Sequence, residues 1–88
     1  MDTMGIEADD AYNRAIVTIL RNRKDELRPI SYEMIAAKAG ISVRTVNRLF
    51  SNERDFKLGQ FIAIARALQM DPGDVVAQAA AVIAEKSE

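Results

Sequence analysis

Two helical patterns follow each other in residues 31–50, and only Gly40 and Ile41 lie between the last turn of the first and the cap of the second. Ser31 and Ser42 suit the N-cap position, because a serine hydroxyl accepts a hydrogen bond from an unpartnered amide of the first helical turn. Gly40 suits the end of the first helix, because glycine adopts the left-handed conformation without steric penalty. Such a short connection forces two helices to cross steeply, so this segment predicts a tight helical corner.

Apolar residues at helical spacing predict the inner faces of the two helices. Each start also has two apolar residues that flank its cap as a hydrophobic staple: Ile30 with Ile35, and Ile41 with Val46. The predicted inner faces are Ile35, Ala36 and Ala39 in the first helix and Val46, Leu49 and Phe50 in the second.

Three further helices complete an all-α fold with five helices and no strand. One is expected from about Asp9 to residues 23–27, before Pro29, and another from about Leu58 to Gln69, after a loop over residues 51–57. The last opens at Asp71, which caps it. Their predicted inner residues are Tyr12, Ala15, Ile16, Ile19 and Leu20; Leu58, Phe61, Ile62, Ala65 and Leu68; and Val75, Val76, Ala79, Val82 and Ile83. We expect one domain over residues 9–84, a flexible acidic segment over 1–8 and a flexible end over 85–88.

The composition excludes most catalytic chemistry. The chain has no cysteine and no histidine, so it lacks disulfides, thiol nucleophiles, histidine bases and the usual zinc ligands. We therefore expect no enzyme, no metal, no cofactor and no small-molecule ligand. The chain has no apolar run of membrane-spanning length and its N-terminus is acidic, which together predict a cytoplasmic protein without a membrane span or secretory signal.

Charge is distributed unevenly along the chain. Residues 11–57 carry ten basic and five acidic side chains, whereas residues 1–10 carry four acidic ones and residues 58–88 carry a net charge of −2, so the chain totals −1. A basic region on a nearly neutral protein is sufficient for contact with phosphates, because the electrostatic field close to the binding surface attracts DNA more than the net charge repels it. The alternative is that these bases are scattered over the surface.

The segment from Ile30 to Phe50 resembles the helix-turn-helix of the Cro/phage-repressor (XRE-like) family. The matching features are Ala36 beneath the turn, Gly40 in the turn, Ile41 after it, Ser42 as cap, and Val46 and Leu49 inside. The stretch from Arg54 to Val75 resembles the helices that follow in that family, so the resemblance covers about residues 10–76. It implies a five-helix lambda-repressor-like DNA-binding domain.

The outward face of the second corner helix carries side chains suited to reading bases. These are Val43, Arg44, Asn47 and Arg48. Arginine can donate two hydrogen bonds to guanine and asparagine can form two with adenine in the major groove, while Val43 could meet a thymine methyl group or pack inside. The alternative is a solvated helix face.

Other residues are predicted to contact the DNA backbone. Tyr32 stands where the family often has glutamine, and its phenol can still donate to a phosphate. Thr45 could bond a phosphate or cap its own helix. The complete predicted set is Tyr32, Ser42, Thr45, Asn52, Arg54 and Lys57, the last three by their family position after the corner.

The last helix is apolar over a wide surface. Its apolar side chains span an arc of roughly 160°, whereas packing on one core needs about 100°. We therefore expect a homodimer, at least on DNA, through Val76, Ala80 and Ile83. The alternative is that alanine serves as a neutral surface residue.

Together these features predict a transcriptional regulator of bacterial or phage origin, a Cro-like repressor that binds operator double-stranded DNA in the nucleoid. The alternative is a protein-interaction module, or an antitoxin, built on the same fold.

Overall fold

The computed structural model describes the backbone of residues 2–86 and the side chains of residues 10–85. Over this range the chain forms helices and connecting segments without a strand. The helices are α1 (Asp2–Glu26), α2 (Tyr32–Ala39), α3 (Val43–Phe50), α4 (Leu58–Ala67) and α5 (Pro72–Lys86). The predicted all-α, five-helix fold is confirmed.

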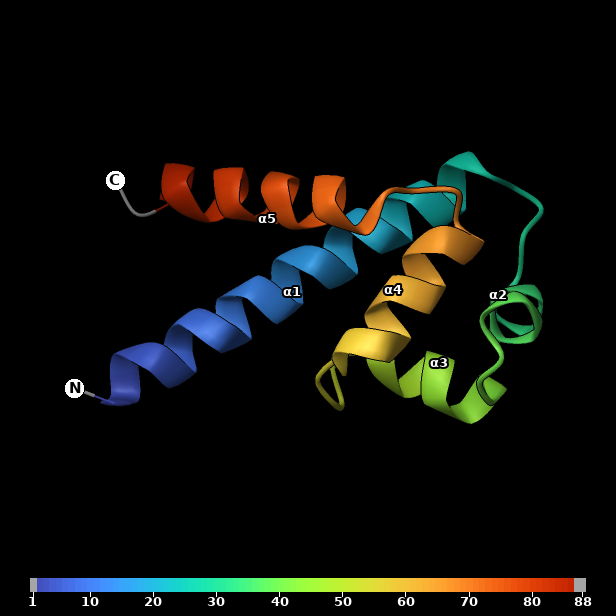
Figure 1. Ribbon diagram of the computed structural model, residues 1–88, viewed down its shortest axis with the longest axis horizontal. Coiled ribbons are helices and arrows are strands. Elements are labelled where there is room, and N and C mark those ends of the chain that lie inside the picture. The colour runs from blue at the N-terminus through green and yellow to red at the C-terminus, as the bar shows by residue number, and fades with distance from the viewer. Residues whose placement is uncertain (1, 87–88) are drawn as a thin grey trace.

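The helices form a compact body from which two long helices extend (Figure 1). α2 packs against α3 and α4, while α1 packs mainly along α5. The N-terminal end of α1 and the C-terminal end of α5 lie at the same end of the molecule, away from α2 and α3. The molecule is consequently elongated, with extents of 40 × 22 × 18 Å.

The core lies where α1, α4 and α5 meet the corner formed by α2 and α3. Its largest fully buried side chains are Val17, Leu20, Ile35, Val46, Leu49, Phe50, Ile64, Leu68 and Val75. Burial of each such side chain contributes about 1.5–3 kcal/mol to folding. The inner faces predicted for α2 and α3 are confirmed, since Ile35, Ala36, Val46, Leu49 and Phe50 are buried and Ala39 packs against them.

The corner between α2 and α3 is built as its caps predict. The Ser31 hydroxyl accepts a hydrogen bond from the Met34 amide at 3.2 Å, and the Ser42 hydroxyl accepts one from the Thr45 amide at 3.1 Å. Gly40 ends α2 in the left-handed conformation, with φ at 74°. These local contacts set the direction of α3.

The turn from α4 to α5 is also fixed locally. Asp71 Oδ1 accepts hydrogen bonds from the amides of Gly73, at 2.7 Å, and Asp74, at 3.4 Å. The predicted cap is therefore confirmed. α4 ends at Ala67, two residues before the predicted end, and Gln69 has a left-handed φ of 62°.

α1 begins earlier than predicted, at Asp2 instead of Asp9. Adding residues to an existing helix is much easier than nucleating one, and acidic residues favour a helix N-terminus, so this segment needs no apolar periodicity of its own. The flexibility expected for residues 1–8 and 85–88 stays a prediction, because residues 1, 87 and 88 lie outside the described part and so do the side chains up to residue 9. α5 itself continues to Lys86.

The predicted inner faces of α1, α4 and α5 need correction. On α5, Val75 and Ala79 are buried as predicted, but Val76 and Val82 are 43% and 36% exposed. On α1, Leu20 is buried as predicted, but Val17 and Asn13 are buried as well, whereas Tyr12, Ala15, Ile16 and Ile19 are half-buried. The buried face of α1 is rotated from the predicted one, because a polar residue such as Asn13 is not counted when a buried face is inferred from apolar spacing. On α4, Leu58 is 74% exposed, since the first residue of the helix projects beyond the core that Phe61, Ile64 and Leu68 fill.

Candidate nucleic-acid interface

The packing of α3 decides which of its side chains face outward. Val46, Leu49 and Phe50 are buried, and this turns Arg44, Asn47 and Arg48 towards solvent. Within the described residues, neither arginine forms an ion pair, because the two ion pairs present join Arg14 to Asp10 and Arg23 to Glu26. α3 therefore presents two guanidinium groups and one amide that are available to a ligand.

Two residues at the start of α3 are less available than the sequence predicts. Val43 is half-buried and packs against the core, so its methyl groups are partly used inside the protein. Thr45 is half-buried, and its hydroxyl accepts a hydrogen bond from the Ser42 hydroxyl at 2.9 Å. Ser42 and Thr45 thus act first as a cap, and only their remaining hydrogen-bonding capacity could serve a phosphate.

Tyr32 lies between three helices. Its ring centroid is 5.2 Å from that of Phe50, with the rings tilted by 51°, and Lys24 Nζ lies 4.9 Å from the Tyr32 centroid. These contacts hold the start of α2 against the end of α3 and bring a cation of α1 alongside. Tyr32 is half-buried, so much of its ring serves packing.

Arg21 of α1 joins the predicted site at its edge. It lines a shallow hollow of about 290 Å³ together with Tyr32 and with Asn47 of the outward α3 face. The sequence predicts Arg21 only as part of the basic region, because tertiary packing decides which side of α1 meets α3. Glu53 lines the same hollow, and its carboxylate accepts a hydrogen bond from the Ser51 hydroxyl at 3.0 Å.

The loop before α4 carries the remaining predicted contacts. Asn52 is exposed with a left-handed φ of 63°, Arg54 is half-buried and Lys57 is exposed at the N-cap of α4. A lysine side chain has no acceptor, so it cannot cap the first amides of α4. The loop therefore combines cations with an uncapped helix N-terminus, two features that favour phosphate.

A family model described as helix-turn-helix matches residues 21–75, which is more than half of the chain. The chain belongs to the Cro/phage-repressor (XRE-like) helix-turn-helix family. This domain binds DNA and is not catalytic. No curated protein and no solved structure matches the chain. The matched region contains α2, α3 and α4 entire, whereas most of α1 and most of α5 lie outside it.

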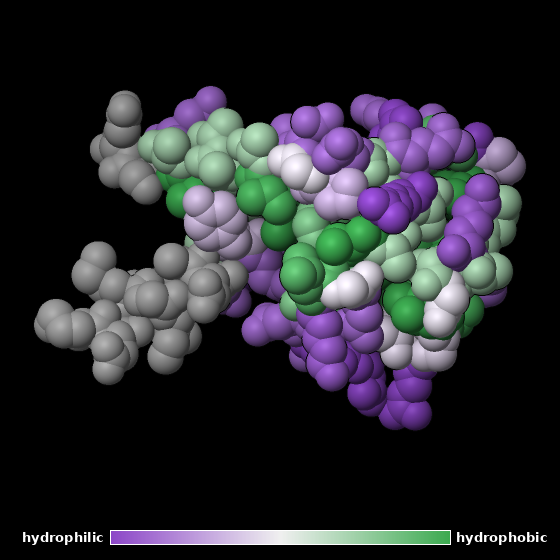
Figure 2. Space-filling view, in the orientation of Figure 1, coloured by the Kyte–Doolittle hydropathy of each residue, from purple (hydrophilic) through white to green (hydrophobic). Residues whose placement is uncertain are grey.

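Hydrophilic and apolar side chains share the face of this helix-turn-helix protein that Figure 2 shows. Hydrophilic side chains gather at the lower end, where Figure 1 places α3 and the loop before α4, and also at the upper right, over the end of α1 and the start of α5. Apolar side chains lie along α5 and between α1 and α4. Of the residues predicted for dimerisation, Val76 is 43% exposed, while Ala80 and Ile83 are half-buried. Ile83 lines an apolar hollow of about 390 Å³ between α1 and α5.

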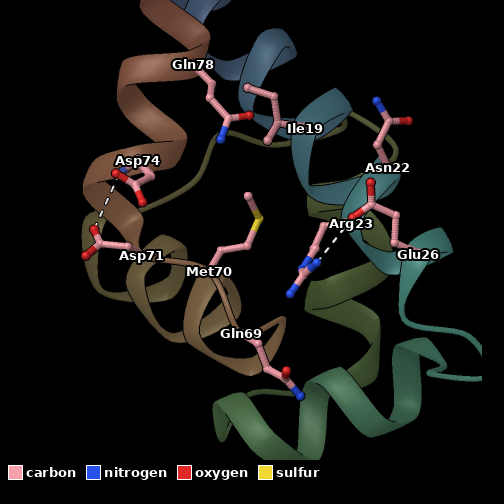
Figure 3. A pocket seen from close by; sticks show the side chains of 9 residues that line it. All are labelled: Ile19, Asn22, Arg23, Glu26, Gln69, Met70, Asp71, Asp74 and Gln78. Atoms are coloured by element: carbon pink, nitrogen blue, oxygen red, sulfur yellow. Dashed lines mark hydrogen bonds and ion pairs between the residues drawn. The ribbon is translucent and has the colours of Figure 1, made fainter.

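A third hollow, which is polar, is lined by residues of α1, of α5 and of the turn between α4 and α5 (Figure 3). It has a volume of about 450 Å³ and is lined by Ile19, Asn22, Arg23, Glu26, Gln69, Met70, Asp71, Asp74 and Gln78. Arg23 Nε donates a hydrogen bond to the Leu68 carbonyl at 3.0 Å, and Arg23 Nη1 lies 3.2 Å from Glu26 Oε1. Arg23 therefore ties α1 to the end of α4.

Within the described residues, no helix has the length and apolar character needed to cross a bilayer.

Proposed function

We propose that this protein is a sequence-specific transcriptional regulator, a Cro-like repressor that inserts α3 into the major groove of operator DNA. The observation that carries this proposal is the exposed group of Arg44, Asn47 and Arg48 opposite the buried face of α3. Arginine suits guanine and asparagine suits adenine, because each pair can form two hydrogen bonds in a geometry that other bases do not offer. A protein with this role works in the nucleoid of a bacterial or phage-infected cell.

Contacts to phosphates would set the register of α3 in the groove. Lys57 and Arg54 supply charge at one end of α3, and Tyr32 lies at a hollow that Asn47 also lines. Asn52, Ser42 and Thr45 can add neutral hydrogen bonds. Such contacts orient a protein on DNA without distinguishing sequences, so the base-reading group alone carries specificity.

The proposal includes a homodimer on DNA through Val76, Ala80 and Ile83. Val76 is the most exposed of the three and adjoins an apolar hollow of about 430 Å³, which Leu58 and Phe56 also line. Two-fold dimers of helix-turn-helix proteins read two half-sites about one helical turn apart, so this assembly predicts a palindromic operator.

Selection from a random duplex library, followed by titration of the enriched site at two salt concentrations, tests the proposal. We expect a palindromic motif that is bound about 10³-fold or more tightly than scrambled DNA. Absence of any enriched motif, with only weak salt-sensitive binding, would contradict a sequence-specific repressor. It would favour the alternative, a protein-interaction module or antitoxin that uses the same fold.

A further inference from the structure

Asn13 is the buried polar side chain among the residues whose side chains are described, and it is 9% exposed. It lies on α1, one helical turn before the buried Val17. Asn13 Oδ1 accepts a hydrogen bond from the backbone amide of Phe56 at 3.1 Å, across 43 residues of sequence. Asn13 lies outside the region that matches the family, whereas Phe56 lies inside it. A residue of the N-terminal helix thus holds a loop of the helix-turn-helix domain.

The second half of this loop has few other attachments. The amides of Ser51, Asn52 and Glu53 donate to carbonyls of α3, at 3.1, 3.3 and 2.9 Å, so the first half continues that helix. Farther along, the described hydrogen bonds of the loop amides are the one to Asn13 and a longer one, 3.5 Å, from Lys57 to the Gln60 side chain. The Phe56 ring meets Phe61 edge-on, with centroids 6.1 Å apart.

We propose that Asn13 is a positioning residue for DNA binding: it fixes the loop so that Arg54, Lys57 and the start of α4 meet the phosphate backbone. This inference rests on the proposed function. Phe56 stands between Arg54 and Lys57, so a bond at its amide restrains both cations. Without this bond the loop is no longer held in place, and cations that are not held beside the phosphates neutralise fewer of them.

Packing of the core alone does not explain why residue 13 is polar. Its neighbours along the inner face of α1, Val17 and Leu20, are apolar, and a leucine at position 13 would extend that stripe. An apolar side chain could not accept a hydrogen bond from the Phe56 backbone amide, so it would leave this partly buried amide without its partner. The asparagine is therefore explained by the loop that it holds.

The test compares Asn13→Leu and Asn13→Ala with Val17→Ala, each titrated with the selected operator and with random duplex over a range of salt concentrations. Asn13→Leu places an apolar side chain of similar size in the core, in case Asn13→Ala does not fold. We expect both Asn13 variants to bind the two DNAs about tenfold more weakly, with a salt slope shallower by about 0.9 for each phosphate that the variant no longer neutralises. Val17→Ala removes buried volume from the same helix, so it should lower the melting temperature while keeping the wild-type slope.

The same titrations with Arg54→Ala/Lys57→Ala, alone and combined with Asn13→Leu, locate the effect. If Asn13 acts through these cations, adding Asn13→Leu to the double variant should change the slope little further. A wild-type slope in the Asn13 variants, together with a reduced slope in Arg54→Ala/Lys57→Ala, would overturn the inference and leave the proposed function intact. An unchanged slope in Arg54→Ala/Lys57→Ala would instead show that these two cations do not contact phosphates, which would contradict this inference and the phosphate contacts included in the proposed function.

Discussion

Single side chains on α3 carry the proposed specificity. Replacing Arg44 or Arg48 with alanine should weaken binding to the selected operator by about 5- to 150-fold, because a bidentate contact to a base discriminates by about 1–3 kcal/mol. The loss on random duplex should be much smaller. Both arginines are exposed and take no part in the core, so the melting temperature should change little. Fluorescence anisotropy with the two DNAs measures the difference.

Lys57→Ala is the matched control for these arginine variants, since Lys57 is also exposed and is expected to contact phosphate only. It should weaken binding to operator and random DNA by similar factors and make the salt dependence shallower. Equal losses on both DNAs for Arg44→Ala and Arg48→Ala would show that these arginines hold phosphates and that bases are read elsewhere.

The sequence predicts some residues of the site well and others poorly, according to the range of their interactions. Ser31 and Ser42 bond to amides three residues away, so their roles as caps follow from local order. The outward direction of Arg44 follows from the helical period. Asn13 bonds an amide 43 residues away, and only the folded chain brings the two together. The sequence leaves Val43 either to read a base or to pack, and the structure places it partly in the core.

At the scale of helices and turns, replacing either of two glycines with alanine should change the stability of the protein in opposite directions, although both positions have space for a methyl group. A Cβ added at Gly59 or at Gly40 meets no heavy atom within 4 Å beyond the adjacent residues and the backbone of its own helix, but Gly40 has φ at 74°. Gly59→Ala should therefore stabilise the protein by about 0.5–1 kcal/mol, since alanine is the better helix former. Gly40→Ala should destabilise it by about 1 kcal/mol or more, because an alanine is strained in that conformation.

Thermal unfolding of the two glycine variants measures both effects. A change of about 1 kcal/mol shifts the melting temperature of a domain of this size by about 4–8 °C. A lower melting temperature for Gly59→Ala would mean that α4 does not begin as described. If phosphates approach the uncapped start of α4, Gly59→Ala should also bind DNA more weakly while being more stable, and random duplex should report this as clearly as operator.

Helix boundaries are predictable where a cap or a breaker marks them. Ser31, Ser42 and Asp71 mark the starts of α2, α3 and α5, and these starts are confirmed. The start of α1 has no such mark, because a helix continues through acidic residues without apolar spacing. The inner face of α1 is misplaced in the prediction for a related reason: this helix packs against α5 and against the loop before α4, so its buried stripe includes a polar residue.

At the scale of the whole molecule, part of the apolar breadth of α5 is used within the chain. Val75 and Ala79 are fully buried, and α5 packs along α1. The wide apolar arc therefore reflects the contacts of α5 with α1 and with α4, as well as the proposed partner surface. The fold can be predicted from residue patterns along one chain. A dimer interface is marked in the sequence only by apolar residues that the core does not need, such as the exposed Val76, and the sequence does not say what covers them.

Replacing Val76 with glutamate tests the proposed dimer. A charge at this exposed position should prevent two protomers from packing together, while the core beneath it stays intact. On a duplex with both half-sites, the variant should lose cooperative binding and about 10²-fold or more in affinity, whereas affinity for a single half-site should be unchanged.

Sedimentation velocity with a labelled operator counts the protomers on each duplex. Ala81→Glu is the control, because Ala81 is exposed on another side of α5 and receives the same charge. It should retain two protomers per palindrome and wild-type cooperativity. If Val76→Glu also retained both, the dimer would have to form through another surface. A single wild-type protomer on a palindromic site would remove the dimer from the proposal while leaving base reading by α3 unaffected, since that depends on the exposed face of one helix.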